Sequence, residues 1–389
     1  MAKWLEKTLG EVTAFIAKGI PPKYTEEENE NTIRVLNQKC NRNFEISYNE
    51  SRIHDCEKKK VPVDKMLRSG DVLINSTGTG TAGRVAQLVE VTVPTTIDGH
   101  MILMRPSEEL DPIYYGYAVK SFQSQIEGLA EGSTGQTEIN RRRLQDEVII
   151  RYPSDKLVQK NIGSFLANID EKIKTNKEIN KNLEQQAQAI FKSWFIDFEP
   201  FGNRKPSDWS VSTLGNVSIM GAGGDKPQSV SQIKTDLYEY PIYSNGLSNE
   251  GLYGFTDKPK IFEESVTVSA RGTIGFVCLR HIPYVPIVRL VTLIPKAEII
   301  SAKYLYLWLK QLHITGTGTT QQQLTVPYFQ KTEILVPSQE IVTLFTTTVD
   351  PIFEKIWANQ NENEKLSSLR DTLLPKLMSG ELDVSGIDL

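Results

Sequence analysis

Two polar segments of the sequence carry side chains that can hydrogen-bond to the edge of a nucleotide base. They are residues 132–143 (GSTGQTEINRRR) and 315–323 (TGTGTTQQQ). Gln and Asn can offer adenine a donor and an acceptor together, and Arg can donate two hydrogen bonds to guanine. A solvated surface loop is the alternative interpretation, but the recurrence of such a segment favours function. The candidate contact residues are Gln136, Asn140, Arg141, Arg142 and Arg143 in the first segment and Gln321, Gln322 and Gln323 in the second.

Two glycine turns supply a second set of polar groups. Residues 71–75 (DVLIN) lead into STGTGTAGR, and residues 265–270 (SVTVSA) lead into RGTIG, so each turn follows a predicted strand. A turn of this kind presents backbone N–H groups and small hydroxyls at an exposed tip. The candidate residues here are Thr77, Thr79 and Arg84 in the first turn and Arg271 and Thr273 in the second.

Other chemistries are poorly supported. Gly78, Gly80 and Gly83 match G-x-G-x-x-G, but the residues that follow predict a strand where a dinucleotide site needs a helix. The chain has no Gly-Lys pair for a Walker A loop and no intact Asp/Asn-Pro-Pro-Tyr/Phe motif of an adenine methyltransferase. His54 and Cys56 are too few for a metal site. We therefore expect no catalytic residues, no metal and no cofactor in this chain.

Composition is that of an ordinary globular protein. The 389 residues are 39% hydrophobic and 24% charged, with a net charge of −4, so phosphate contacts would need a local basic patch. The three cysteines are too sparse for a disulfide framework, and no apolar run is long enough to span a membrane. These features predict a cytoplasmic protein with reduced thiols and no membrane partner.

An internal repeat organises the elements that must position these residues. WLEKTLGEV begins at Trp4, and WSVSTLGNV begins at Trp209. Each phrase opens a block of short Val/Ile/Thr-rich strands, followed by a predicted helix (112–129 or 302–313), the polar segment and a last strand ending in Pro-Ser. A long predicted helix follows each block. The sequence therefore predicts an α+β protein in the order block, helix, block, helix.

The two long helices carry matching apolar ladders with heptad spacing. The first runs from Ile162 through Trp194, and the second repeats its spacing 183 residues further on, from Phe345. Both ladders contain two asparagines, and a buried amide at such a seam fixes register because it must find a partner. We expect an antiparallel coiled coil paired through Ile169, Ile173, Asn176, Asn180 and Leu183 on one helix and Ile352, Ile356, Asn359, Asn363 and Leu366 on the other.

Two phrases at the ends of these helices carry a family resemblance. Residues 191–201 read FKSWFIDFEPF and residues 373–382 read LLPKLMSGEL. Together with the repeated TLG, they resemble the DNA-specificity (S) subunit of type I restriction-modification enzymes along the whole chain. The resemblance implies two target recognition domains (1–154 and 202–338), each of α/β type and reading half of a split, asymmetric target in double-stranded DNA. It also implies two conserved helical regions (155–201, and 339–389 with the C-terminal tail).

The same resemblance implies partners and a division of labour. The helices would set the spacing of the half-sites and dock two methyltransferase subunits, which would bind S-adenosylmethionine, with restriction/translocase subunits joining further out. We expect Trp194, Phe195 and Phe198 to pack the helix end against a recognition domain or a methyltransferase, with an intramolecular core as the alternative. Two other functions stay open: a nucleotide-dependent enzyme using the Gly78 loop, and a freestanding decoy that sequesters a methyltransferase.

Overall fold

The computed structural model describes residues 3–132, 137–316 and 322–382. Contacts divide the chain into two compact units: unit 1 is Met1–Asn176 with Asn361–Leu389, and unit 2 is Lys177–Gln360. Both long helices, α4 (Lys156–Phe195) and α8 (Gln339–Ser379), contribute one part to each unit. Within the described ranges, no helix is both long and apolar enough to cross a membrane.

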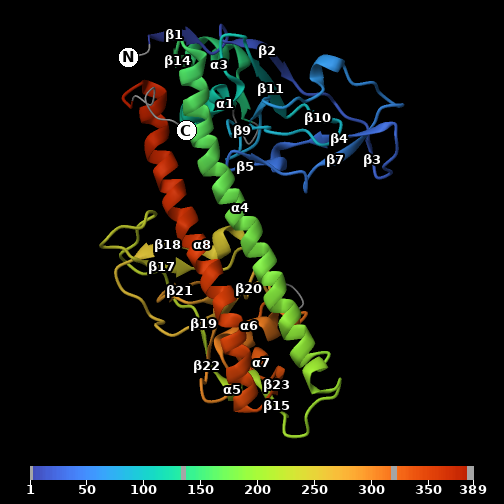
Figure 1. The fold of residues 1–389 in the computed structure, drawn as a ribbon, viewed down its shortest axis with the longest axis vertical. Helices are drawn as coiled ribbons and strands as arrows, with labels where there is room; N and C mark the ends of the chain where they lie inside the picture. Colours follow the sequence, from blue (N-terminus) through green and yellow to red (C-terminus); the bar gives the residue numbers. More distant parts are fainter. Residues whose placement is uncertain (1–2, 133–136, 317–321, 383–389) are drawn as a thin grey trace. The chain divides into compact units, whose positions relative to one another are not determined.

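Unit 1 is built on two four-stranded sheets (Figure 1). One is antiparallel, in the order β2-β11-β8-β9, and the other, in the order β10-β4-β7-β3, contains one parallel pair, β10 with β4. A third pairing joins the first strand, β1, to the last, β14. The strands are β1 (Trp4–Thr8), β2 (Thr13–Lys18), β3 (Tyr24–Thr25), β4 (Thr32–Leu36), β5 (Asn41–Arg42), β6 (Glu45–Ile46), β7 (Arg52–Asp55), β8 (Val72–Asn75), β9 (Val85–Gln87), β10 (Thr95–Ile97), β11 (Met101–Pro106), β12 (Ala130–Glu131), β13 (Glu138–Ile139) and β14 (Ile149–Pro153).

Unit 2 repeats this topology. Its antiparallel sheet has the order β16-β22-β19-β20, its second sheet has the order β18-β17-β21 with β17 and β21 parallel, and β15 pairs with the last strand, β23. The predicted internal repeat is therefore a repeat of fold. The strands are β15 (Ser210–Thr213), β16 (Ser218–Ala222), β17 (Tyr240–Tyr243), β18 (Leu252–Thr256), β19 (Ser265–Val268), β20 (Val277–Arg280), β21 (Val285–Pro286), β22 (Val291–Pro295) and β23 (Glu333–Val336).

The short helices differ from the predicted ranges. The predicted helix 112–129 is two helices, α1 (Pro112–Ser121) and α2 (Gln123–Gly128), because Phe122 leaves the helical conformation between them. The predicted helix 302–313 is α6 (Ala302–Gln311). The polar segment of unit 1 ends in a helix that we did not predict, α3 (Arg141–Glu147). Unit 2 also contains α5 (Leu214–Val217) and α7 (Val326–Phe329).

The repeated Thr-Leu-Gly phrase has the same structural role in both units. Gly10 N–H donates to the Gln145 carbonyl, and Gly215 N–H donates to the Gln330 carbonyl. A Cβ atom on either glycine would lie 3.1 or 3.0 Å from the glutamine Cβ, which is tighter than ordinary packing. Glycine therefore allows the first strand of each unit to approach the segment that precedes its last strand.

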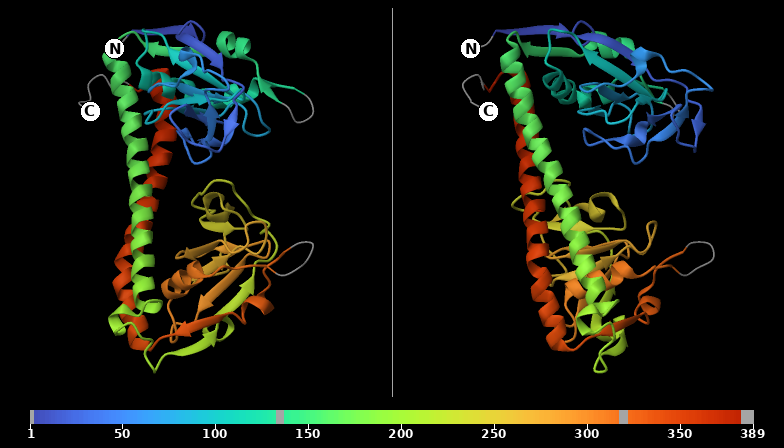
Figure 2. Two further views of the ribbon diagram at one scale, coloured as in Figure 1. Left: turned by 90° about the vertical axis from the view of Figure 1, so that its right-hand side faces the viewer. Right: turned by 45° about the vertical axis from the view of Figure 1, so that its right-hand side comes forward.

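In unit 1, α4 and α8 lie side by side and antiparallel (Figures 1 and 2). Arg370 on α8 forms an ion pair with Asp170 on α4, and Asn176 Nδ2 donates to Asn363 Oδ1 at 2.9 Å. Tyr117 of α1 donates to the other oxygen of Asp170 at 2.6 Å. Helix α1 of unit 1 is thus bonded directly to the part of the helix pair that lies in this unit. The buried residues of α4 and α8 in this core are Val158, Ile162, Leu166, Leu374, Leu377 and Met378.

The helix pair in unit 2 follows the same antiparallel register. Asn359 Nδ2 donates to Asn180 Oδ1 at 2.7 Å, and Asn180 Nδ2 donates to the Ile356 carbonyl at 3.1 Å. Both asparagine pairs expected at the helix seam are therefore present in the structure. The other seam residues proposed for pairing, Ile169, Ile173, Leu183, Ile352 and Leu366, are buried or half-buried on α4 and α8.

Both long helices are followed by a left-handed residue. Helix α4 ends at Phe195 and does not extend to the predicted 201, because Phe198 has φ 56° and residues Glu199–Phe201 form a separate 3₁₀ turn, η3. Helix α8 ends at Ser379, and Gly380 (φ +78°) supplies the left-handed residue that commonly terminates a helix. A Cβ on Gly380 would lie 2.6 Å from the Trp4 ring, so this glycine also packs against the first strand of unit 1.

Candidate nucleic-acid interface

In unit 1 the glycine turn and the polar segment lie beside each other. Thr77, just after β8, forms a β-bridge with Glu138 of β13, and Ile139 N–H donates to the Ser76 carbonyl at 2.7 Å. Thr77 Oγ1 also bonds to two residues that the sequence did not single out, Gln38 and His100, the latter at 3.0 Å through Nδ1. The turn is therefore part of a continuous polar edge formed from four separate stretches of chain.

Unit 2 brings the corresponding segments together. Leu324 N–H donates to the Ala270 carbonyl at 3.0 Å, and Arg271 Nη2 donates to Gln323 Oε1 at 3.1 Å. Asn245, another residue missed at the sequence level, accepts a hydrogen bond from Ala270 N–H at 2.7 Å. Each unit thus joins its glycine turn to its polar segment, although more than fifty residues separate the two in sequence.

The other predicted residues of the glycine turns have different exposures. Thr79 lies exposed at the tip of the first turn, whereas Arg84 is half-buried and donates to the Gly80 carbonyl at 2.9 Å. Thr273 Oγ1 is buried, without a hydrogen-bond partner among the residues described. Gln322 is exposed, and Gln136 and Gln321 lie outside the described residues. Of the two turns, the first therefore offers the more accessible hydroxyl.

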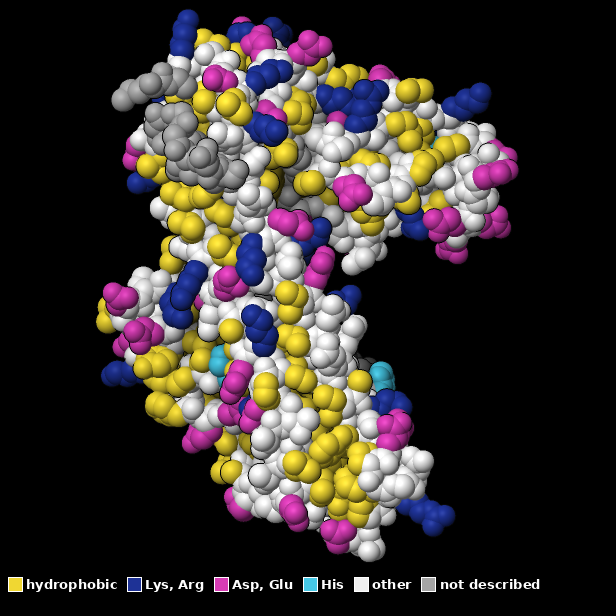
Figure 3. Space-filling view, viewed as in Figure 1, with side chains coloured by type: hydrophobic (Ala, Val, Ile, Leu, Met, Phe, Trp, Pro, Cys, Tyr) yellow, Lys and Arg dark blue, Asp and Glu magenta, His cyan; other side chains and the backbone are white. Residues whose placement is uncertain are grey.

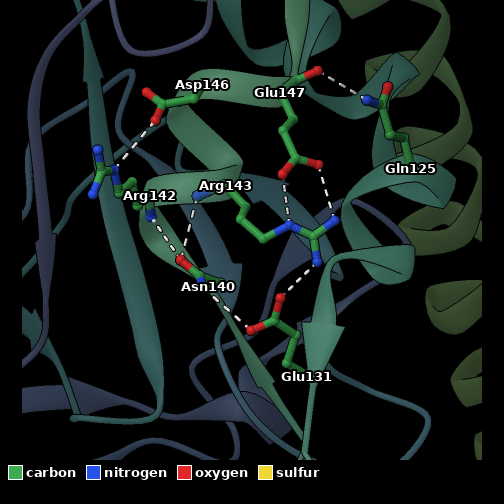
Figure 4. Close-up of polar contacts among 7 residues, drawn as sticks. All are labelled: Gln125, Glu131, Asn140, Arg142, Arg143, Asp146 and Glu147. Atoms are coloured by element: carbon green, nitrogen blue, oxygen red, sulfur yellow. Dashed lines mark hydrogen bonds and ion pairs between the residues drawn. The ribbon is translucent and has the colours of Figure 1, made fainter.

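The arginines of the unit 1 segment divide into accessible and engaged side chains (Figure 4). Asn140 is the N-cap of α3, and its Oδ1 accepts from the backbone N–H groups of Arg142 and Arg143. The Arg142 side chain is 92% exposed, with Asp146 3.6 Å away, and Arg141 is also exposed. These two arginines can reach a ligand without breaking a strong contact.

Arg143 is held by two carboxylates. It donates to both oxygens of Glu147, at 2.6 and 2.9 Å, and to Glu131 at 2.6 Å (Figure 4). These hydrogen bonds raise the pKa of Arg143 and lower the pKa of Glu147 and of Glu131 below their usual range. Because its donors are occupied, Arg143 fastens α3 to β12 in this structure, and a base contact would require one of these ion pairs to open.

The glycines of the first turn serve packing. Gly83 has φ +85°, and a Cβ there would lie 2.6 Å from the Glu127 Cα of α2. A Cβ on Gly78 would meet Thr81 Oγ1 at 2.3 Å. The turn is followed by strand β9, so the helix N-terminus that holds a pyrophosphate in dinucleotide sites does not follow it. This arrangement disfavours the nucleotide-dependent alternative.

The histidine and cysteine side chains of the described residues do not gather into a metal site. His54 is buried and uses both ring nitrogens, one accepting from Lys23 N–H at 2.8 Å and the other facing the Lys59 carbonyl at 2.7 Å. Cys40 and Cys278 are buried thiols, and Cys56 is partly exposed. No group of three or more His, Cys, Asp or Glu side chains in the described ranges could hold a metal ion.

The aromatic residues at the end of α4 form part of the unit 2 core. Phe195 is 1% exposed and packs edge-to-face on Tyr304 and Phe345, with ring centroids 4.8 and 4.9 Å apart. Trp194 and Phe198 are half-buried. The structure therefore contains the intramolecular packing against the unit 2 core, and of these three residues Trp194 and Phe198 keep surface that a partner could touch.

Charge does not identify the interface. Positive and negative side chains are interspersed on the face that Figure 3 shows, as expected for a chain with a net charge of −4. The interface must therefore be recognised from hydrogen-bonding groups gathered at one edge of each unit, and from similarity to known proteins.

Comparison with known proteins places both halves of the chain in one family. Residues 1–185 and 206–367 match the family described as "Type I restriction modification DNA specificity domain". The Type I restriction enzyme MjaIX specificity subunit of Methanocaldococcus jannaschii is 28% identical over 310 residues, which cover 70% of this chain and 69% of that one. The HindI specificity subunit of Haemophilus influenzae is 28% identical over 312 residues, covering 59% and 68%.

A solved structure has a similar fold. The crystal structure of a type I restriction-modification S subunit from M. genitalium superposes with a TM-score of 0.59 at 19% identity. The match covers 97% of this chain and 96% of that one.

Proposed function

This chain belongs to the type I restriction-modification DNA specificity family, and we propose that it is the subunit that selects the DNA sequence for such a complex. The observation that carries the proposal is the polar edge that recurs in both units, where a glycine turn meets a second polar segment. In this role the chain is not itself catalytic. An associated methyltransferase supplies the chemistry and binds S-adenosylmethionine.

The two units are proposed to read different half-sites. Unit 1 offers Arg141, Arg142 and His100 at its polar edge, whereas unit 2 offers Arg271 and Gln323. Because arginine favours guanine and an amide favours adenine, unlike edges select unlike bases. The target is therefore an asymmetric, bipartite sequence in double-stranded DNA.

We further propose that the helix pair sets the gap between the half-sites. A helix rises ~1.5 Å per residue and DNA rises ~3.4 Å per base pair. Asparagine pairs at two positions, each with one buried member, hold α4 and α8 in one register, which keeps such a spacer at constant length. The helices also provide surface for two methyltransferase subunits, with restriction/translocase subunits joining outside them. The working location is the cytoplasm, where the target DNA lies.

The proposal is tested by DNA binding and methylation. The purified chain, with its methyltransferase partner, is titrated with duplex DNA and separately with nucleotide. We expect duplex binding that weakens with salt and adenine methylation at a split motif. Nucleotide binding without duplex binding would instead support the enzyme that uses the Gly78 loop. Capture of the methyltransferase with loss of its methylation would support the decoy.

A further inference from the structure

A strained turn projects an arginine from unit 2. Between β21 and β22, Val288 and Arg289 have φ angles of 53° and 60°, so two consecutive non-glycine residues are left-handed. This conformation is costly for L-residues, and most costly for a β-branched residue such as valine. Strain of this kind persists only where the surrounding structure imposes it, and it concentrates at functional sites.

Neighbouring backbone groups hold the turn in place. Val288 N–H donates to the Gly224 carbonyl at 2.9 Å, and Arg289 N–H donates to the Gly223 carbonyl at 2.8 Å. Asn245 Nδ2 donates to the Val288 carbonyl at 2.7 Å. A Cβ on Gly223 would lie 2.7 Å from Ile287 backbone atoms, so glycine is required for this approach. Hydrogen bonds from three partners therefore fix the direction in which the Arg289 side chain leaves the backbone.

The same contacts connect the turn to the polar edge of unit 2. Asn245 uses Nδ2 for Val288 and Oδ1 for Ala270 N–H, and Ala270 directly precedes Arg271. One amide side chain thus joins the strained turn to the loop whose Arg271 bonds to Gln323. Arg289 is exposed, and its guanidinium makes no hydrogen bond or ion pair with any residue that the structure describes.

The fold itself does not need an arginine here. In unit 1 the corresponding turn, between β10 and β11, places Gly99 and His100 at the positions of Val288 and Arg289, and neither of them is left-handed. Glycine would also suit the left-handed position in unit 2 better than arginine does. The chain therefore places an arginine where glycine would adopt the same backbone conformation with less strain.

We propose that Arg289 reads a guanine in the half-site recognised by unit 2, by donating two hydrogen bonds to N7 and O6 in the major groove. This inference rests on the proposed function. A fixed backbone suits such a contact because paired donors require the guanidinium plane in one orientation. A phosphate contact would carry no sequence information.

The test compares Arg289→Lys, Arg289→Gly and the exposed control Arg204→Ala in the full chain with its methyltransferase partner. Methylated motifs are read by single-molecule sequencing, duplex binding is titrated at several salt concentrations, and the melting temperature of each chain is measured. In Arg289→Lys, we expect the preference for guanine over the other bases to fall about 5- to 150-fold at one position of one half-site. We expect Arg289→Gly to lose it as well while melting at the same or a higher temperature. Arg204→Ala should keep the wild-type motif.

Two results would overturn the inference, and they are distinguishable. If Arg289→Lys keeps the wild-type motif while Arg289→Gly only weakens binding uniformly, with a salt slope lower by about 1, the residue is a phosphate contact. If the wild-type chain directs no split motif at all, the proposed function fails and the inference fails with it.

Discussion

The asparagine pair of unit 2 yields a quantitative prediction. Asn359 is 1% exposed, and its Nδ2 donates to Asn180 Oδ1 at 2.7 Å. Replacing Asn359 by leucine leaves the Asn180 oxygen without that donor in the seam. An unsatisfied polar group of this kind costs about 1–3 kcal/mol. Replacing both asparagines by leucine removes donor and acceptor together, so we expect the double variant to be near wild type or more stable.

A double-mutant cycle measures this coupling. Tryptophan fluorescence during urea unfolding reports chiefly on unit 2, because four of the five tryptophans, Trp194, Trp209, Trp308 and Trp357, lie there. We expect the double variant to be about 1–3 kcal/mol more stable than the sum of the two single effects would predict. If the double variant is instead destabilised by the sum of the singles, the asparagines do not satisfy each other in solution and the register argument fails.

The asparagine pair of unit 1 serves as a matched control. Asn176 Nδ2 donates to Asn363 Oδ1 at 2.9 Å and also to Glu362 Oε2 at 2.8 Å. Because this donor keeps a second acceptor, Asn363→Leu should cost less than Asn359→Leu. Equal costs would show that the second acceptor contributes nothing.

Three further predictions concern the helix pair and its attachments. Burial, assisted by nearby Arg370, lowers the pKa of Lys120 to about 8, so the unfolded chain binds more protons between pH 8 and 10.5 and stability rises with pH in that window. Lys120→Met should therefore stabilise the chain at pH 7 by roughly 1–3 kcal/mol, and a gain that does not shrink by pH 10.5 would contradict this. Four residues inserted after Asn176 with four after Asn359, both between the two asparagine pairs, should lengthen the unread gap by about one or two base pairs; an unchanged gap in the methylome would refute the spacer role. Trp194→Ala should destabilise unit 2 by as much as ~3 kcal/mol, and a stable variant that still co-purifies with the methyltransferase would exclude this residue from the interface.

Local periodicity explains why the helix pair could be predicted. The heptad ladders placed Asn176 and Asn180 on one helix and Asn359 and Asn363 on the other, and the structure pairs them as 176 with 363 and 180 with 359. The two TLG phrases predicted the repeated topology. Such features depend on residues close in sequence, so they are visible without a structure.

The polar edges depended on information that sequence patterns lack. The sequence predicted Asn140 and Arg143 as base-contacting side chains. In the structure Asn140 caps α3, and Arg143 is held by Glu131 and Glu147. Nothing local shows that Glu131 lies within reach of Arg143. Arg289 was missed because its neighbours, Ile-Val-Arg-Leu, contain none of the residues that favour a left-handed turn. Only the tertiary hydrogen bonds to this turn reveal it.

The most direct test is to sequence the methylated genome of a cell that expresses the methyltransferase with and without this chain. We predict adenine methylation in a split, asymmetric motif that disappears when the chain is absent. Methylation that is independent of the chain, or that falls in one contiguous motif, would contradict the claim that the two units read separate half-sites.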